Sequence, residues 1–212
     1  MELREERERI AEYGRRLIRN GLTRGTGGNL SVCNRERNLM AISPSGMAYE
    51  EITPEDVVVL DLEGRVVDGK RKPSSELDMH SIVYRGRTDL NAVVHTHAPF
   101  TAAIAALQVD LPAASYLLSL AGGTVRCSKY ATFATRELAE YAYEGMIDRK
   151  AVLLANHGLL AGGIDLADAF NVAEAVEFSA EVYVRAASMG RPAIIPDDEL
   201  QRMFEKFQGY GR

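Results

Sequence analysis

Short apolar runs, each bounded by turn residues, constrain the fold of this chain more than any other feature of its sequence. Aliphatic and β-branched runs of this length, flanked by Gly, Pro, Asn or Asp, are typical of strands. The early runs are separated by short turns, so at least part of the resulting sheet should be antiparallel. The runs occupy residues 29–33, 39–43, 57–62, 92–95, 124–127 and 151–156.

Helical patterns alternate with these runs. The helix expected over 166–189 follows Asp165, a good N-cap residue, and ends at Gly190. Strands and helices mixed along 212 residues, with no repeat or long linker, predict a sheet covered by helices, an α/β or α+β sandwich in one domain, residues 1–212. Apolar periodicity predicts the other helices at the N-terminus and at 75–86, 99–107, 134–148 and 198–207.

Charge and composition exclude several classes of function. The formal net charge of −5 argues against a nucleic acid or an anionic membrane as partner. The first residues are charged and no apolar run is long enough to cross a membrane, which predicts a cytoplasmic protein. Cys33 and Cys127 lie far apart in strand-like segments, so reduced thiols are expected.

Three of the four histidines lie where apolar runs end. Side chains two residues apart on a strand project to the same side, so His95 and His97 should point together. His157 follows the run of 151–156. A single histidine is more often a core or rim residue, but neutral imidazole is the usual ligand of Zn²⁺ and catalytic zinc typically has three protein ligands. The combination favours a metal site.

Small polar residues cluster in 24–29, 43–46 and 72–76. A dinucleotide-binding glycine motif is excluded, because Leu30 stands where its third glycine would be needed. The glycine turns, together with Asn29 and nearby serine hydroxyls, could instead form a nest for a phosphate. Each stretch alone is more often an ordinary turn or helix cap, and only the three together suggest a phosphate site.

Glu76 directly follows Ser74 and Ser75. A carboxylate there could bind a metal, act as a general base, or do both in turn; its alternative is a common first-turn helix carboxylate. His80 shares a helix face with Glu76 and is interpreted as a surface histidine in preference to a partner of a site residue.

Taken in order, GTGGNLSV, SPSG, KPSSE, NAVVHTH, the YATF of 130–133 and NHGLLAGG resemble the class II aldolase/epimerase family over nearly the whole chain. The resemblance implies a single-domain, three-layer α/β sandwich, with a central, largely antiparallel mixed sheet flanked by helices. It also implies a homotetramer with active sites at subunit interfaces, and a phosphorylated sugar as substrate.

The family's functional residues fall on matching positions of this chain. The resemblance implies one Zn²⁺ per subunit held by His95, His97 and His157. Glu76 would join the metal at rest and act as base once substrate displaces it. The implied phosphate-binding positions are Gly28, Asn29, Ser45, Gly46, Ser74 and Ser75.

The implied activity is reversible cleavage of a ketose 1-phosphate, foremost L-fuculose 1-phosphate, to dihydroxyacetone phosphate and L-lactaldehyde. Tyr116 would reach the site of an adjacent subunit and assist at the aldehyde oxygen. Phe133 would line the aldehyde pocket, and Tyr210 would help to close the site.

Other members of the family remain alternatives. L-ribulose-5-phosphate 4-epimerases usually carry SSD where this chain has SSE, and they have an acidic proton carrier in the segment matching SYLLSLAGG, which here contains no acid. A methylthioribulose-1-phosphate dehydratase keeps the three histidines and is harder to exclude. Aldolases acting on rhamnulose or 5-deoxy-pentulose phosphates differ mainly in pocket details. Non-catalytic adducin-head modules lose the zinc histidines, which this chain retains.

Overall fold

The computed structural model describes residues 1–208, and its strands form one sheet in the order β4-β3-β2-β1-β5-β7-β6. Within these residues every ladder between neighbouring strands is antiparallel, as expected for most of the sheet. The strands are β1 (Asn29–Asn34), β2 (Leu39–Ile42), β3 (Val58–Asp61), β4 (Val66–Asp68), β5 (Ala92–Thr96), β6 (Ala151–Leu154) and β7 (Gly158–Gly163).

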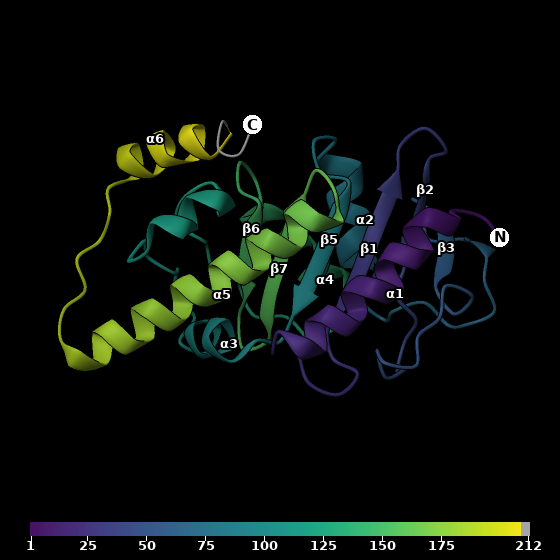
Figure 1. Ribbon diagram of the computed structural model, residues 1–212, viewed down its shortest axis with the longest axis horizontal. Coiled ribbons are helices and arrows are strands. Elements are labelled where there is room, and N and C mark those ends of the chain that lie inside the picture. The colour runs from purple at the N-terminus through teal and green to yellow at the C-terminus, as the bar shows by residue number, and fades with distance from the viewer. Residues whose placement is uncertain (209–212) are drawn as a thin grey trace.

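Helices cover both faces of the sheet and give three layers (Figure 1). One face carries α1 (Arg4–Arg19), α3 (Pro99–Ala106), the 3₁₀ helix η1 (Tyr116–Ala121) and the long α5 (Leu166–Met189), with α6 (Asp197–Gln208) packed on η1. The other face carries α2 (Leu77–Gly86) and α4 (Arg136–Gly145).

A buried apolar cluster lies on each side of the sheet. Val94 of β5 belongs to the cluster with α1 and α5, whereas its neighbour Val93 belongs to the cluster with α2 and α4. Successive strand side chains alternate between faces, so an uninterrupted apolar strand such as β5 supplies both clusters. Full burial of one such side chain stabilises the folded protein by about 1.5–3 kcal/mol. The predicted sandwich is confirmed.

The predicted helices all form, and α5 has the expected start and end. Asp165 Oδ1 accepts a hydrogen bond from the backbone N–H of Asp168 at 2.8 Å, and Gly190 follows the last turn. The strand predicted at 124–127 is wrong. Val125 and Cys127 make only isolated bridges there, and no ladder forms. The sequence also missed β4, β7 and η1.

β7 determines where the histidines meet. It pairs antiparallel with both β5 and β6, so β5 and β6 run in the same direction and end at the same edge of the sheet. The start of β1 lies at this edge too, since Asn29 pairs with His95. Across residues 1–208, no helix combines the length and the apolar character that a membrane crossing would require.

Candidate active site

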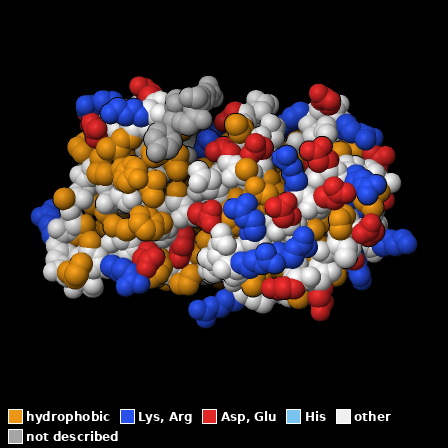
Figure 2. Space-filling view, viewed as in Figure 1, with side chains coloured by type: hydrophobic (Ala, Val, Ile, Leu, Met, Phe, Trp, Pro, Cys, Tyr) orange, Lys and Arg blue, Asp and Glu red, His pale blue; other side chains and the backbone are white. Residues whose placement is uncertain are grey.

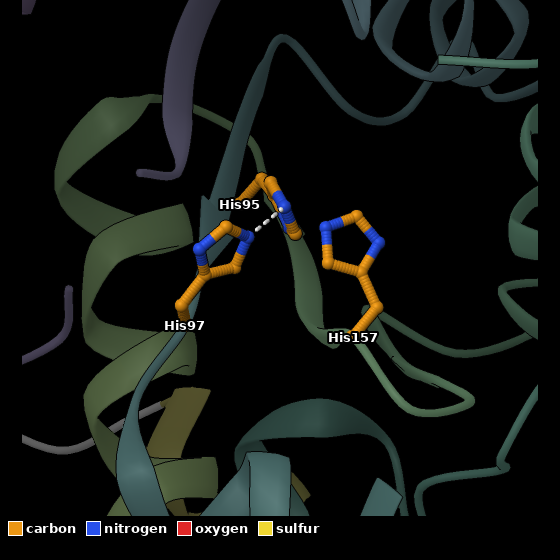
Figure 3. A group of neighbouring side chains, drawn as sticks. All are labelled: His95, His97 and His157. Carbon is orange, nitrogen blue, oxygen red and sulfur yellow. Dashed lines mark hydrogen bonds between the residues drawn. The ribbon is translucent and has the colours of Figure 1, made fainter. Parts of the chain in front are cut away.

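Three imidazoles converge at this edge of the sheet. His95 comes from β5, His97 directly follows that strand, and His157 lies in the turn between β6 and β7. Figure 3 shows the rings facing a common point. Their centroids are 4.7, 4.8 and 5.0 Å apart, and one nitrogen from each ring lies within 4.8 Å of the others. Such a group could hold a metal ion.

The hydrogen bonds of His95 leave one ring nitrogen for a ligand. Its Nδ1 lies 2.8 Å from the backbone oxygen of Leu159, which can only accept, so Nδ1 carries the proton. The lone pair is therefore on Nε2, which lies 2.9 Å from Nε2 of His97. A backbone carbonyl that fixes the tautomer in this way is the usual companion of a metal-binding histidine.

Glu76 faces the histidines from the N-cap of α2. Its Oε2 lies 3.3 Å from His95 Nε2, and its Oε1 lies 3.5 Å from His157 Nε2. Asn29 Nδ2 donates to Oε2 at 2.9 Å, but Oε1 is buried and receives no hydrogen bond from any of residues 1–208. A buried carboxylate oxygen without a donor is costly, and a cation among the three imidazoles would satisfy it. These residues fit a divalent metal.

The protonation states suit such a cation. Burial lowers the pKa of His97 and of His157 from 6.5 to about 4 each, so both rings are neutral near pH 7. Burial would by itself raise the pKa of the Glu76 carboxyl, but its interactions with the His95 and His157 rings and the hydrogen bond from Asn29 outweigh burial and hold the pKa below its ordinary value of 4.5. The site therefore offers neutral imidazoles and an anionic carboxylate, the forms that bind metals.

A cavity of about 490 Å³ lies beside Glu76, His97 and His157. This volume is typical of a site for a small molecule. Gly28 has a φ of +71°, and a Cβ there would lie 2.5 Å from the backbone oxygen of His95, so only glycine allows this close approach. The predicted substrate-site residues that line the cavity are Gly28, Asn29, Ser45, Gly46, Ser74, Ser75 and Phe133.

The roles of two tyrosines remain predictions, one cavity residue was missed, and the interpretation of one histidine is corrected. Tyr116 lies outside the cavity lining; it is 52% exposed in η1, and its ring stacks on Phe207 with centroids 6.0 Å apart. Tyr210 lies outside the described residues. Tyr130 lines the cavity and was missed, although it opens the YATF stretch that contains Phe133. His80 is fully buried, so its interpretation as a surface histidine is wrong.

Comparison with known proteins agrees with this geometry. The Class II Aldolase and Adducin N-terminal domain family matches residues 8–184. The chain is 57% identical to a 5-deoxy-D-ribulose 1-phosphate aldolase of Bacillus thuringiensis serovar kurstaki, over 100% of both chains. It is 43% identical to a 5-methylthioribulose-1-phosphate/5-deoxyribulose-1-phosphate aldolase of Rhodospirillum rubrum, over 97% of this chain and 92% of that one.

A solved structure of an L-fuculose 1-phosphate aldolase superposes with a TM-score of 0.94 at 47% identity and covers 96% of each chain. The family match, the relatives and the superposition each extend over most of the chain. The chain therefore belongs to the class II aldolase and adducin N-terminal domain family.

Proposed function

We propose that this protein is a zinc-dependent class II aldolase that cleaves a short ketose 1-phosphate with an apolar terminal group into dihydroxyacetone phosphate and a small aldehyde. One observation carries the proposal. Three imidazoles converge beside a buried carboxylate oxygen of Glu76 that has no hydrogen-bond donor among residues 1–208, and His97, His157 and Glu76 border a cavity lined by small polar residues.

Cleavage of the C3–C4 bond removes a proton from the C4 hydroxyl and delivers a proton to C3 of the dihydroxyacetone phosphate fragment. A divalent cation held by His95, His97 and His157 would act as a Lewis acid and stabilise the negative charge that develops on this fragment. The ionised Glu76 carboxylate borders the cavity and acts first as a base: it takes up the proton released by the C4 hydroxyl, directly or through Tyr116, and then delivers that proton to C3. In the reverse, condensation direction the same carboxylate removes the proton from C3. Tyr116 from a neighbouring subunit assists at the aldehyde oxygen.

The phosphate is bound by neutral donors. Among the described residues, none that lines the cavity is a lysine or an arginine. Backbone N–H groups around Gly28 and Gly46, the amide of Asn29, the hydroxyls of Ser45, Ser74 and Ser75, and the N-terminus of α2 are the groups available. Backbone nests and helix N-termini bind phosphate in this way.

The substrate we favour is 5-deoxy-D-ribulose 1-phosphate, which would yield acetaldehyde. The full-length relative at 57% identity carries that name, and this evidence outweighs the L-fuculose 1-phosphate expected from the sequence. Both sugars end in a methyl group. Phe133 and Tyr130 border the cavity and offer apolar rings against which such a terminus can pack.

A substrate panel tests this proposal. 5-Deoxy-D-ribulose 1-phosphate, 5-methylthioribulose 1-phosphate and L-fuculose 1-phosphate are each assayed for release of dihydroxyacetone phosphate. We expect the first to have the highest kcat/KM, with a preference of about tenfold or more, the scale on which pockets distinguish small groups. Loss of water from the methylthio sugar without carbon–carbon cleavage would instead establish a dehydratase, and epimerisation of added L-ribulose 5-phosphate an epimerase. A protein inactive on all four, without bound metal, would support a non-catalytic module.

We further propose that the protein is a homotetramer in which Tyr116 serves a neighbour's site. Figure 2 shows hydrophobic side chains gathered beside α6 and along the C-terminal half of α5, and Phe178 and Met189 of α5 are exposed. Large exposed apolar surfaces commonly mark interfaces. Mixing the inactive variants Tyr116→Phe and Glu76→Gln should restore activity, because some sites of the hybrid tetramer receive both native residues. A fully active dilute monomer, or hybrids without recovered activity, would refute this arrangement.

A further inference from the structure

A continuous chain of buried polar side chains leads from the protein interior to Glu76. Tyr84 OH lies 2.5 Å from Ser31 Oγ, which lies 2.7 Å from His80 Nδ1. His80 Nε2 contacts Asn29 Oδ1, and Asn29 Nδ2 lies 2.9 Å from Glu76 Oε2. Tyr84, Ser31 and His80 are fully buried, and Asn29 and Glu76 nearly so. Of these five hydrogen-bonded residues, only Asn29 and Glu76 border the cavity.

The direction of every hydrogen bond follows from the carboxylate at the end. Asn29 donates through Nδ2 to Glu76 Oε2, so its Oδ1 faces His80 and can only accept. His80 Nε2 therefore donates to Asn29. Complete burial lowers the pKa of His80 to about 3, so the ring is neutral and its Nδ1 accepts. The hydroxyl of Ser31 then donates to Nδ1 and accepts from Tyr84.

This series of hydrogen bonds fixes the orientation of the Asn29 side-chain amide. An amide has nearly the same shape when its nitrogen and oxygen are exchanged, so packing alone does not select its orientation. The flipped amide would direct Oδ1 against the Glu76 carboxylate, and the two oxygens would repel each other. The donor on His80 Nε2 favours the orientation in which the NH₂ group faces Glu76. Successive donors pointing the same way also strengthen one another.

We propose that His80 is a positioning residue for the aldol reaction: through Asn29 it holds the Glu76 carboxylate in place for proton transfer. The inference rests on the proposed function, since it assigns His80 a task in that reaction. His80 belongs neither to the cavity lining nor to the group of three imidazoles, and its hydrogen-bonded connection to Glu76 runs through Asn29.

Kinetics of matched variants test this role. We expect His80→Leu, which removes both hydrogen bonds at similar volume, to lower kcat by about 10- to 100-fold, the scale expected when a catalytic group is displaced. KM should change much less. His80→Gln retains a donor for Asn29 and should recover most of kcat. A His80→Leu enzyme with parental kcat, or a Gln variant as impaired as the Leu variant, would overturn the proposal.

A double-mutant cycle separates positioning from general destabilisation. If His80 acts through Asn29, then adding His80→Leu to Asn29→Ala should lower kcat by no more than about twofold, because coupled residues are non-additive. Full additivity of the two losses would refute the coupling. Thermal unfolding of each variant verifies that the comparison is made between folded proteins.

Nuclear magnetic resonance of ¹⁵N-histidine in the metal-free parent gives a readout independent of activity and of the folding of the Leu variant. The His80 signals, identified by their loss in His80→Gln, should show the proton on Nε2 and a lone pair on Nδ1 near pH 7. A proton on Nδ1 would reverse the chain and overturn the inference even in an active aldolase. The expected tautomer in a protein inactive on the substrate panel would instead count against the proposed function alone.

Discussion

Glu76 is the residue at which the candidate metal ligands, the proposed proton transfer and the buried polar side chains meet. One carboxylate oxygen contacts His95 and accepts from Asn29, while the other faces His157 without a hydrogen-bond donor among residues 1–208. Its two oxygens therefore have different tasks: Oε2 is held in place, and Oε1 is available to a cation or a substrate proton. A substitution that removes the charge of Glu76 but keeps its shape therefore tests the role of Oε1 separately.

Glu76→Gln keeps the shape of the side chain and removes its basicity. We expect kcat to fall by about 10²- to 10⁴-fold, the contribution of a general acid–base group, with a smaller change in KM. Glu140→Gln is the matched control, because Glu140 lies on the exposed side of α4 in a pair with Arg136, and it should leave kcat unchanged. Parental turnover in Glu76→Gln, measured by release of dihydroxyacetone phosphate, would remove Glu76 from the mechanism.

His80 makes a separate contribution to the pH dependence of stability. Burial lowers its pKa from 6.5 to about 3, so between these values the unfolded chain binds a proton that the folded protein does not. Stability is therefore lost as the pH falls below 6.5. From pH 7 to pH 5 this histidine should cost about 2 kcal/mol of unfolding free energy.

Urea unfolding of the metal-free parent and of His80→Gln at the two pH values measures this cost. The variant lacks the titrating group, so its unfolding free energy should fall by about 2 kcal/mol less than that of the parent. Equal losses in the two proteins would show that His80 is not buried in its neutral form.

At the scale of elements, β7 brings together the candidate metal ligands from separate parts of the chain. It lies between β5 and β6, and its first residue, Gly158, approaches β5 so closely that a Cβ would lie 2.2 Å from the backbone oxygen of Thr96 and 3.1 Å from His97 Cδ2. The strand thus depends on glycine at the point where it passes the imidazoles. Any side chain there would separate β7 from β5 beside the candidate metal site.

Gly158→Ala should consequently destabilise the fold by about 1–3 kcal/mol, the usual cost of overpacking, and weaken zinc binding. Gly190→Ala is a suitable control, because a Cβ there would meet no atom within 4 Å. Thermal unfolding and zinc titration of both variants provide the comparison. Unchanged stability and zinc affinity in Gly158→Ala would show that the two strands can separate without cost.

The sequence predicted the helix α5 but not the strand β7, and glycines account for both outcomes. The helix α5 was predicted with its bounds, because Asp165 and Gly190 cap a long apolar periodicity. Strand β7 was missed because glycine has a low strand propensity, and its glycines are needed only for close approach to neighbours that the sequence does not identify. Val125 and Cys127 lie in a strand-like run, yet they form only isolated bridges.

At the site, the histidines and the polar turns were recognisable because each occurs next to a strand or helix end. The burial of His80 was not, since it depends on Ser31 and Asn29 of β1, which pack against α2 only in the folded chain. Its spacing from Glu76 was visible, but spacing on a helix does not distinguish a buried face from an exposed one.

At the scale of the whole molecule, one edge of the sheet brings together the candidate metal ligands, the proposed phosphate donors and the buried polar side chains. Residues from β1, α2, β5 and the β6–β7 turn contribute to it, so folding must be complete before the site exists. Metal binding should therefore stabilise the folded protein as a whole, because the unfolded chain does not bring the ligands together.

Removal of the metal should lower the melting temperature. Free zinc at about 100 times its Kd would stabilise the folded protein by about 2.7 kcal/mol, and for a chain of this size each kcal/mol shifts Tm by roughly 2–4 °C. Adding zinc to chelator-treated protein should therefore raise Tm by several degrees, measured by calorimetry. His157→Ala should show little response. An equal shift in the parent and in His157→Ala would place the stabilising ion elsewhere.

Anomalous X-ray diffraction from zinc-loaded crystals, collected on both sides of the zinc absorption edge, tests most directly whether the three imidazoles and Glu76 form a metal centre. We expect one strong peak per chain, about 2.0–2.1 Å from a ring nitrogen of each of His95, His97 and His157. A peak bound elsewhere, or none between these rings, would contradict this expectation.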